Sequence, residues 1–217
     1  MLKIEKELWE KGYDYIACID EVGRGCLAGD VVACALIMPK ELVIEDVKDS
    51  KKLTPRKREK LYDIILDKAI GVGIGRVDSK TIDEINIKKS TLLAMKRAVE
   101  NLKDKEGNKI KPDFLLIDAE KIDMNIPQMS VIKGDSKCHG IAAASIIAKV
   151  FRDRLCYDWS KKYEGYDLEN NKGYGTKKHR EALKKLGPSA IHRKSFLKKI
   201  LTQEKQISLF GDENEDR

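Results

Sequence analysis

The sequence lacks any apolar run that approaches the roughly 20 residues needed to cross a bilayer. Its first dozen residues also lack the character of a secretion signal, because they carry Glu5, Glu7 and Glu10. These absences argue against an integral membrane protein and against an exported one. We therefore expect a cytoplasmic protein with no membrane partner.

Cysteines are few, and their spacing does not suit a disulfide framework or a metal cluster. The five cysteines are odd in number and form no C-x-x-C pair, so a disulfide scaffold and a zinc site are both disfavoured. At 217 residues the chain is long enough to bury a substantial core without such staples. A reducing compartment fits this cysteine usage.

An excess of negative charge is also absent. Lysine and arginine number 43 against 36 acids, which gives a formal charge of +7. Such an excess favours a polyanionic partner. The alternative is an ordinary solvated surface, because a high density of mixed charge also keeps a protein in solution.

What the sequence does contain is an alternation of strand patterns and helical patterns. Thr54 and Pro55 suit the N-cap and the first position of a helix over residues 55–70. A glycine-rich bend joins the first two strands, which we expect to be close neighbours. The pattern predicts strands over residues 13–20, 31–39, 71–77, 114–118 and 129–134, and further helices over residues 79–102 and 140–163. This order predicts an α/β fold, a mixed five-stranded sheet flanked by helices.

The composition shifts near residue 165 towards glycine, lysine and histidine. We predict a main catalytic domain over residues 1–164 and a small C-terminal helical extension over residues 165–203, with two short basic helices. Residues 204–217 are predicted to be a flexible tail, because they end in a run of acids and small polar residues.

Four carboxylates stand at or near the ends of predicted central elements. Asp20 and Glu21 end the first strand, Asp118 closes the fourth, and Asp135 precedes the long helix. Carboxylates gathered at one sheet edge raise one another's pKa unless a cation holds them together. Mg²⁺ and Mn²⁺ prefer oxygen ligands, and two such ions about 4 Å apart suit phosphodiester hydrolysis. The alternatives are local, since Asp135 could cap the helix and Asp118 could start a turn.

The adjacent acids pose a geometric difficulty. Neighbouring residues on a strand point to opposite faces, so Asp20 and Glu21 could not share a site in the middle of a regular strand. Gly23 and Gly25 follow at once and tolerate unusual backbone dihedrals. We therefore expect the two acids to lie where regular pleating stops.

A series of motifs occurs in order from about residue 14 to residue 197: IDEVGRGCLAG, DSKKLT, IDA, KGDSK, IAAASIIAKVFRD, NKGYGTKKH and GPSAIHRKSF. This series resembles ribonuclease HII, the type 2 ribonuclease H family. The resemblance implies a ribonuclease H fold with a helical C-terminal extension. It implies cleavage of the RNA strand of RNA–DNA hybrids, including at a single ribonucleotide in duplex DNA. It also implies that the catalytic, metal-binding acids are Asp20, Glu21, Asp118 and Asp135.

The resemblance further implies how the substrate is read. Gly23, Arg24 and Gly25 match the stretch that contacts the ribonucleotide 2′-hydroxyl and the flanking backbone, largely through main-chain groups. Tyr174 matches the residue that stacks on the deoxyribose after the ribonucleotide. A 2′-hydroxyl is what distinguishes RNA from DNA at a site. The alternative for Tyr174 is a core tyrosine, although its flanking glycines and lysines disfavour burial.

Three further residues resemble phosphate contacts of the family, namely Lys51, Ser145 and Lys149. The alternatives are a solvated lysine at each lysine position and a serine that packs between helix and sheet. The residues themselves do not separate these possibilities.

The sequence departs from the family pattern at a few positions. Cys26 and Asp30 stand where prolines are common, and Asp30 adds negative charge near the expected site. These differences bear on loop rigidity and metal affinity rather than on the reaction. His139 lies close to Asp135 in the sequence, and we regard it as no more than a weak candidate for a proton carrier.

The segment QISLF near the C-terminus resembles the peptide with which bacterial replication and repair proteins bind the sliding clamp. Gln206 is followed by spaced apolar residues that end in Leu209 and Phe210. Unfolded flanks would allow these side chains to dock into a pocket on the clamp. The alternative is a frayed helix end whose apolar residues fold back on the body.

The residues and the resemblance together predict a metal-dependent endonuclease that cuts 5′ of a ribonucleotide and leaves 3′-hydroxyl and 5′-phosphate ends. Its role would be ribonucleotide removal in DNA repair and replication. We expect a monomer with Mg²⁺ or Mn²⁺ as cofactor, and lysines that bind phosphate in a salt-sensitive way. The alternative is a duplex-binding factor without catalysis that is recruited to the clamp.

Overall fold

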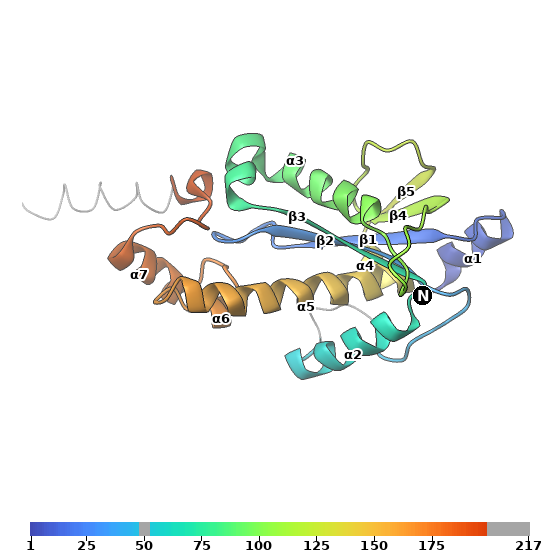
Figure 1. Cartoon of the computed structure of the whole chain (residues 1–217), viewed down its shortest axis with the longest axis horizontal. Coiled ribbons are helices and arrows are strands. Elements are labelled where there is room, and N and C mark those ends of the chain that lie inside the picture. The colour runs from blue at the N-terminus through green and yellow to red at the C-terminus, as the bar shows by residue number, and fades with distance from the viewer. Residues whose placement is uncertain (48–52, 199–217) are drawn as a thin grey trace, which may run out of the picture.

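The computed structural model describes residues 1–47 and 53–198. Its strands are β1 (Ile16–Val22), β2 (Val31–Ile37), β3 (Gly71–Val77), β4 (Phe114–Asp118) and β5 (Gln128–Val131). They form one sheet in the spatial order β3-β2-β1-β4-β5 (Figure 1). β1 pairs antiparallel with β2 and parallel with β4, while β2–β3 is antiparallel and β4–β5 is parallel. The predicted mixed five-stranded sheet is confirmed.

Helices surround this sheet. They are α1 (Lys3–Glu10), α2 (Pro55–Lys68), α3 (Ser79–Glu100), α4 (Gly134–Lys137), α5 (His139–Lys162), α6 (Leu168–Asn171) and α7 (Lys177–Leu186). The helix at α2 begins as predicted, because the Thr54 hydroxyl accepts a hydrogen bond from the Lys57 amide at 3.3 Å. The sequence did not predict the one-turn helices α4 and α6, since four residues are too few to show a helical period.

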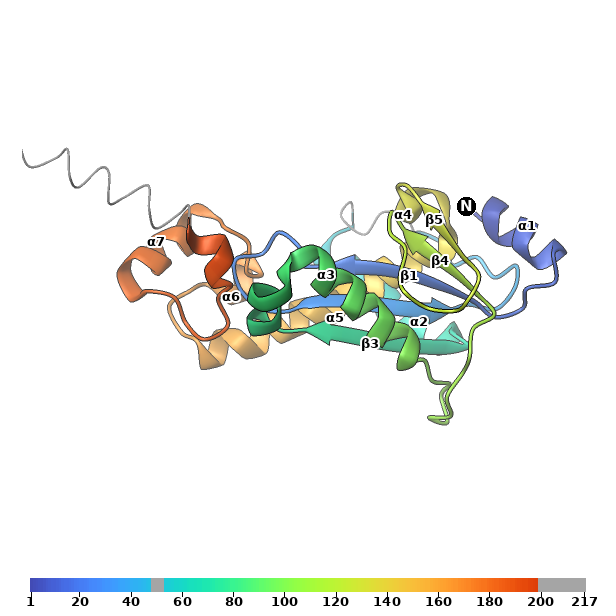
Figure 2. The same cartoon turned by 90° about the horizontal axis from the view of Figure 1, so that it is seen from above.

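The sheet is covered on both faces. α3 lies over one face, and α5 with α2 lies over the other (Figure 1 and Figure 2). β2 is buried along its whole length: Ala33, Ala35 and Ile37 belong to the core with α3, whereas Cys34 and Leu36 belong to the core with α5 and α2. Full burial of a large apolar side chain contributes roughly 1.5–3 kcal/mol, so this strand anchors both layers.

Glycine allows α3 to pack very close to β3. A Cβ atom on Gly73 would stand 2.0 Å from the carbonyl oxygen of Ala98, and one on Gly75 would stand 1.9 Å from that of Ala94. Any side chain at either position would push the helix away from the strand. The glycines of GVGIGRV are therefore a packing requirement.

α3 is interrupted at Asn86, where the sequence predicted one continuous helix. Asn86 has φ 69° and ψ 164°, a combination that residues other than glycine rarely adopt and that interrupts the helical backbone. Its side-chain oxygen accepts a hydrogen bond from the Lys89 amide at 3.1 Å, which caps the second half of the helix. The prediction of an unbroken helix is wrong here because this side-chain bond competes with the helical backbone.

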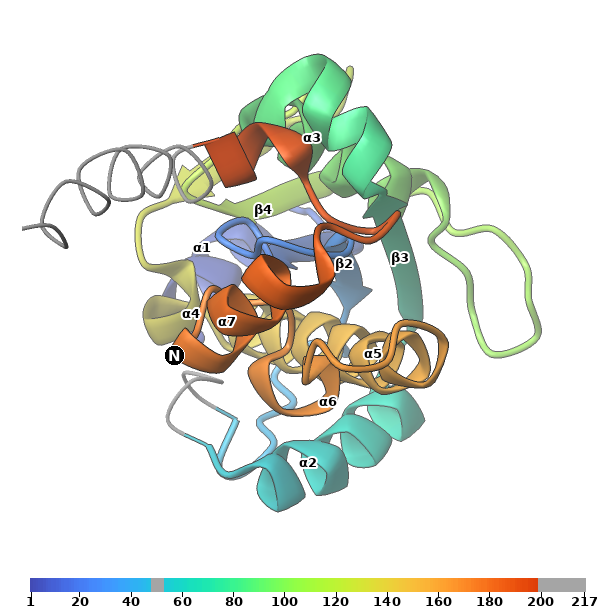
Figure 3. The same ribbon diagram turned by 90° about the vertical axis from the view of Figure 1, so that its left-hand side faces the viewer.

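The C-terminal segment with α6 and α7 lies beyond one end of the sheet (Figure 1 and Figure 2), so that it stands in front of the strands in the end-on view (Figure 3). It is tied to the loop after β1: the Leu27 amide donates to the Gly173 carbonyl at 2.7 Å, and the Arg193 amide donates to the Leu27 carbonyl at 2.8 Å. Leu27 also shares an apolar cluster with Leu183. The domain limits at residues 164 and 203 stay predictions, and residues 199–217 lie outside the described part.

Within the described ranges, no helix combines the length and the apolar character that crossing a membrane would require. All five cysteines fall within these ranges, and each is a free, buried thiol. Burial raises the pKa of the thiols of Cys18 and Cys34, so both are held in the unreactive protonated form at neutral pH.

Candidate active site

Four acidic side chains from distant parts of the chain line one cavity of about 120 Å³. Asp20 and Glu21 come from β1, Asp118 ends β4, and Asp135 lies in the short helix α4. The structure thus brings the four predicted acids together. The rest of the wall is formed by Val22, Ser145, Lys149 and Tyr174.

A larger cavity of about 760 Å³ lies among residues of α2, α5 and α6 and shares Lys149 with the acidic one. Its wall carries cations and acids in similar number, for example Arg58 and Arg154 beside Glu59 and Asp153. Balanced charge gives it no preference for an ion of either sign. The smaller cavity, with four like charges, is the better candidate for chemistry.

The register of β1 shows how neighbouring acids reach the same cavity. Asp20 and Glu21 remain paired with β2, and this ladder continues to Val22. The prediction that regular pleating stops at the two acids is therefore wrong on that side. Pairing of β1 with β4, however, stops at Ile19. The free edge beyond Ile19 leaves side chains from both faces access to the cavity.

Burial sets the electrostatics of the cavity. Asp20 is 8% exposed, and its pKa is raised well above the ordinary value by burial and then by the charges of Glu21 and Asp118. Burial also raises the pKa of Glu21, although the guanidinium of Arg24 opposes the rise. A bound cation would relieve both effects, because it stabilises the charged form of each carboxylate.

Asp118 and Asp135 are linked through the start of α4. The carboxylate of Asp118 accepts a hydrogen bond from the Gly134 amide at 2.7 Å, which fixes α4 against the end of β4. Asp135 lies inside α4. The alternative that Asp135 caps the long helix is not realised, because the N-cap of α5 is Cys138 and no side chain caps it.

Arg24 forms ion pairs at the rim of the cavity. Its Nη1 lies 3.3 Å from Oε1 of Glu21 and 3.0 Å from Oε1 of Glu120. Glu120 is a fifth acid that the sequence analysis missed. The signal for it was its position two residues after Asp118, directly after the IDA motif.

The cavity has the donor chemistry that a divalent ion requires. All four acids supply hard oxygen ligands, and Oε2 of Glu21 is buried without a hydrogen-bond partner. Among residues 1–47 and 53–198, no three His, Cys, Asp or Glu side chains already stand in the geometry of a metal site. The acids therefore suit an ion in kind and number, and they would have to approach one another to coordinate it.

Tyr174 and Ser145 line the cavity in different ways. Tyr174 keeps 40% of its surface exposed, and partial burial of its phenol raises the pKa to about 12. It is therefore not the core tyrosine of the alternative interpretation. Ser145 is buried, and its hydroxyl donates to the Ala142 carbonyl at 2.9 Å within α5. A role for either in binding stays a prediction.

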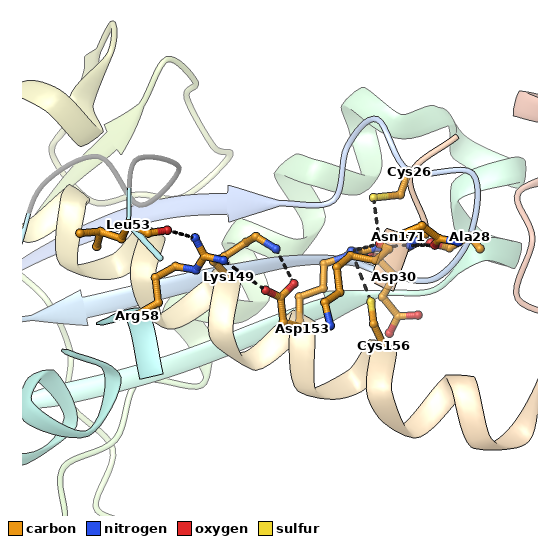
Figure 4. A network of polar contacts seen from close by, with 12 residues as sticks. Cys26, Ala28, Asp30, Leu53, Arg58, Lys149, Asp153, Cys156 and Asn171 are labelled. Atoms are coloured by element: carbon orange, nitrogen blue, oxygen red, sulfur yellow. Dashed lines mark hydrogen bonds and ion pairs between the residues drawn. The ribbon is translucent and has the colours of Figure 1, made fainter. Parts of the chain in front are cut away.

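Lys149 is held in place by a chain of polar contacts (Figure 4). Its ammonium pairs with Asp153 one helical turn later. Asp153 lies 3.9 Å from Nη2 of Arg58, and Nη1 of Arg58 donates to the Leu53 carbonyl at 2.6 Å. These contacts keep a positive charge at the wall of the acidic cavity.

The turn after β1 has one open side and one packed side. A Cβ atom on Gly25 would meet nothing within 4 Å. On Gly23, which has φ +95°, it would come within 2.3 Å of Nε of Arg152. The sequence analysis missed Arg152 and the similarly buried Arg193, both of which contact this turn.

Each position that departs from the family pattern, and also His139, has a polar partner away from the four acids. Asp30 pairs with Arg76 at 2.8 Å, so its charge is balanced and does not add to that of the four acids. The Cys26 thiol donates to the Lys172 carbonyl at 3.5 Å. His139 lines a different cavity, and its Nε2 accepts from the Ile44 amide at 3.1 Å, so it has no contact with the acidic cavity.

Several predicted residues cannot be placed. Lys51 in the DSKKLT motif lies outside the described residues, as do Gln206, Leu209 and Phe210 of the tail. Their proposed phosphate and clamp contacts stay predictions.

Comparison with known proteins identifies relatives over almost the whole described chain. The family model described as Ribonuclease HII matches residues 17–199. The ribonuclease HII of Alkaliphilus oremlandii is 61% identical over 200 residues, which cover 92% of this chain and 98% of that protein.

Solved structures agree with the sequence relatives. The ribonuclease H2 of Pyrococcus horikoshii is similar with a TM-score of 0.71 and 26% identity, covering 88% of this chain and 99% of that one. The RNase HII of Archaeoglobus fulgidus, solved in a complex with PCNA, has a TM-score of 0.67 and 25% identity, with 83% and 94% coverage.

Proposed function

The chain belongs to the ribonuclease HII family and is an endoribonuclease of the ribonuclease H type, and we propose that it cuts on the 5′ side of ribonucleotides in duplex DNA. Its substrates would be RNA–DNA hybrids and duplex DNA that contains single ribonucleotides. The products would carry 3′-hydroxyl and 5′-phosphate ends. Such a reaction would serve ribonucleotide removal in repair and replication.

The observation that supports this proposal is the meeting of Asp20, Glu21, Asp118 and Asp135 in one cavity. We propose that these carboxylates hold divalent ions, Mg²⁺ or Mn²⁺, in a two-metal arrangement. Bound there, the ions would supply an activated water and stabilise the leaving oxygen. The partnerless oxygen of Glu21 is the kind of group that such an ion would satisfy.

The turn over residues 23–25, which follows the cavity residue Val22, and the cavity residues Tyr174 and Lys149 would bind and orient the substrate. We propose that main-chain groups of Gly23, Arg24 and Gly25 contact the 2′-hydroxyl, and the open side of Gly25 leaves room for a sugar. The exposed ring of Tyr174 would stack on the next deoxyribose. Lys149, held by Asp153 at the wall, would face a phosphate.

The experiment is cleavage of a duplex that carries one ribonucleotide, with and without Mg²⁺, followed by mapping of the ends. We expect 5′-side cleavage that requires the metal. Asp118→Asn should reduce the rate about a thousandfold or more, since a lost metal ligand removes several kcal/mol of transition-state stabilisation. The matched control is Asp123→Asn, the same change at an exposed acid outside the cavity.

The same experiment tests the competing function. A duplex-binding factor without catalysis would retain the duplex in a mobility-shift assay and leave it intact at every metal concentration. That outcome would overturn the proposed reaction while leaving the family assignment in place.

We also propose that the tail binds a DNA sliding clamp. The proposal is supported by the QISLF segment and by the relative from Archaeoglobus fulgidus, which was solved with PCNA. A purified bacterial clamp should retain the full chain and release a chain that ends at residue 203. Phe210→Ala should also abolish retention, whereas Glu213→Ala in the same tail should not.

We further propose that the protein acts in the cytoplasm as a monomer. The compartment is supported by the five free thiols, which fit a reducing environment.

A further inference from the structure

Two arginines are buried completely beneath the turn that follows β1. Arg152 of α5 and Arg193 of the C-terminal segment are both 0% exposed. In the part of the chain that the structure describes, neither guanidinium pairs with a carboxylate. Their hydrogen bonds go to main-chain carbonyl oxygens, apart from one long contact between Arg152 and the sulfur of Cys156 at 3.6 Å.

Stability alone does not account for these residues. Moving a guanidinium out of water costs several kcal/mol, and apolar side chains of similar volume are often no worse for stability. Burial lowers the pKa of Arg193 to about 10, which still leaves it charged at neutral pH. We therefore look for the role of each buried arginine in the main-chain groups that it holds.

Arg193 organises the Gly-Arg-Gly turn. Nη2 donates to the Gly23 carbonyl at 2.7 Å, and Nη1 donates to the Arg24 carbonyl at 2.8 Å. Nε and Nη2 both donate to the Gly29 carbonyl, at 3.0 and 2.8 Å. One side chain thus holds three carbonyls of the same loop on its inner side.

Arg152 joins this loop to the segment that carries Tyr174. Its Nε donates to the Asp30 carbonyl at 2.9 Å and its Nη2 to the Ala28 carbonyl at 3.0 Å. Nη1 donates to the Lys172 carbonyl at 2.7 Å, two residues before Tyr174. The two segments are therefore fixed relative to each other through one guanidinium.

The direction of these carbonyls determines the direction of the neighbouring amides. The peptide bonds here are trans, and in a trans peptide the C=O and N–H groups point to opposite sides. Because the Gly23 and Arg24 carbonyls turn inward to Arg193, the N–H groups of Arg24 and Gly25 turn outward. Gly25 is exposed, and a Cβ atom on it would meet nothing within 4 Å.

We propose that Arg152 and Arg193 are positioning residues that present these outward amides to the ribonucleotide and keep Tyr174 in register with them. The inference rests on the proposed function, because it assigns to the turn the reading of a 2′-hydroxyl. Neither arginine would touch the substrate. Each would act through the main chain that it holds, so that the donors need no rearrangement when the substrate binds.

The test compares binding of two duplexes that differ only in one 2′-hydroxyl. Dissociation constants are measured in EDTA, so that no cleavage occurs, for a duplex with one ribonucleotide and for the matching all-DNA duplex. The readout is the dissociation constant for the all-DNA duplex divided by that for the ribonucleotide duplex. General unfolding or loss of phosphate contacts would weaken binding of both duplexes and leave this ratio unchanged. Arg152→Lys and Arg193→Lys should each lower this ratio about tenfold, the loss of roughly one well-placed hydrogen bond, and should leave the affinity for all-DNA duplex nearly unchanged.

Controls match the chemistry of each change. Arg154→Lys alters an exposed arginine of the same helix, and Arg97→Lys alters an exposed arginine that also donates to a carbonyl, that of Arg76 at 2.7 Å. Both should keep the wild-type ratio. If a lysine variant does not fold, as judged by circular dichroism, Arg152→Gln or Arg193→Gln takes its place, because glutamine keeps an N–H donor without a buried charge.

The outcomes separate this inference from the proposed function. If the wild-type ratio is well above one and the Arg152 and Arg193 variants keep the same ratio, the positioning role alone is overturned. A wild-type ratio near one would overturn the reading of the 2′-hydroxyl, and the positioning role with it. An equal loss of affinity for both duplexes would assign the arginines to general stability and would also overturn the inference.

Discussion

The cavity is bounded by two regions that treat their charged groups in opposite ways. The acidic region consists of Asp20, Glu21, Asp118 and Asp135. Burial and the charges of its neighbours raise the pKa of Asp20, and Oε2 of Glu21 is buried without a hydrogen-bond partner. The second region, which we call the reading region after the role proposed for it, consists of the loop over residues 23–30 and the segment over residues 172–174, with the buried side chains that hold them. There, the carbonyls of Gly23, Ala28 and Lys172 each accept a hydrogen bond from a buried arginine.

Two buried histidines add a further hydrogen bond from a buried donor to a carbonyl of the reading region. The Ser189 amide donates to Nδ1 of His192, so the proton of His192 is on Nε2. That proton is donated to Nε2 of His179 at 3.0 Å, and Nδ1–H of His179 then donates to the Tyr174 carbonyl at 2.9 Å. Each ring is neutral, and each has one permitted tautomer.

The contrast shows where the fold tolerates unfavourable electrostatics. A region whose carboxylates repel one another becomes favourable only when a cation arrives. A region that must recognise a shape gains from a complete polar network, because such a network holds a single geometry. Under the proposed function, the first region would be completed by its metal ions, whereas the polar network of the second region is already complete without a ligand.

The largest effect should come from removing one charge of the acidic region. Asp20→Asn keeps the side-chain oxygen that accepts from the Glu21 amide at 2.8 Å but removes a buried like charge. We expect cleavage to fall about a thousandfold, while the melting temperature rises because repulsion is relieved. Cleavage rates and thermal denaturation without metal would check both parts.

The matched control is Asp30→Asn, since Asp30 is also 8% exposed but pairs with Arg76. That variant should lower the melting temperature, because it removes the negative charge with which Arg76 pairs and leaves only a neutral acceptor. If the two variants shifted the melting temperature in the same direction, the contrast between the regions would not hold.

The next effect concerns the pH dependence of the reading region. Burial and the neighbouring His179 lower the pKa of His192 from 6.5 to about 4. Below pH 6.5 the unfolded state binds a proton that the folded state refuses, so stability is full above pH 6.5 and falls as the pH drops towards 4. The loss attributable to His192 should reach up to about 3 kcal/mol.

Urea denaturation of the wild type and of His192→Gln between about pH 7.5 and 4.5 would measure this loss. The variant should start less stable and decline less steeply as the pH falls. Parallel pH profiles would show that His192 does not titrate in the way its buried hydrogen bonds require.

Much of the fold followed from local patterns. Thr54 before Pro55 marked the start of α2, and the apolar runs marked all five strands, because caps and periodicity are written in neighbouring residues. The break in α3 at Asn86 was missed, since an asparagine within a helical pattern usually indicates a surface position. Only the structure shows that its side chain accepts from the Lys89 amide and caps the second half of the helix.

The two regions differed in how visible they were in the sequence. Three of the acids stand near the ends of β1 and β4, and Asp135 lies in the short helix that follows β5, which are places where chemistry is expected. The reading region was partly invisible, because Arg152 holds the carbonyl of Asp30, a group 122 residues away that every residue type carries. A main-chain acceptor leaves no mark in the sequence, so an arginine that binds one resembles a solvated charge.

A smaller effect is expected from Tyr174. Tyr174→Ala should lower cleavage at an RNA-to-DNA junction about tenfold relative to cleavage within a long hybrid, since loss of a sugar contact worth about 1.4 kcal/mol in the transition state changes the rate by that factor. Mn²⁺ affinity, measured by calorimetry, should not change, because the four carboxylates are untouched. Tyr174→Phe should retain most of the selectivity. Unchanged junction selectivity in Tyr174→Ala would remove this residue from the reading region.

The smallest effect should come from Glu120, which touches both regions through Arg24. Its ion pair with Arg24 is partly exposed, with 17% of the Glu120 side chain and 41% of the Arg24 side chain accessible, and such pairs contribute about 0–1 kcal/mol. Glu120→Gln should therefore change the free energy of unfolding by less than about 1 kcal/mol. Mn²⁺ affinity should fall less than about threefold, because Arg24 stays paired with Glu21. Mn²⁺ affinity of Asp20→Asn should be measured in the same calorimeter. If Glu120→Gln lowered this affinity as much as Asp20→Asn does, Glu120 would be a fifth member of the acidic region. Arg24 would then belong to the metal site as much as to the turn.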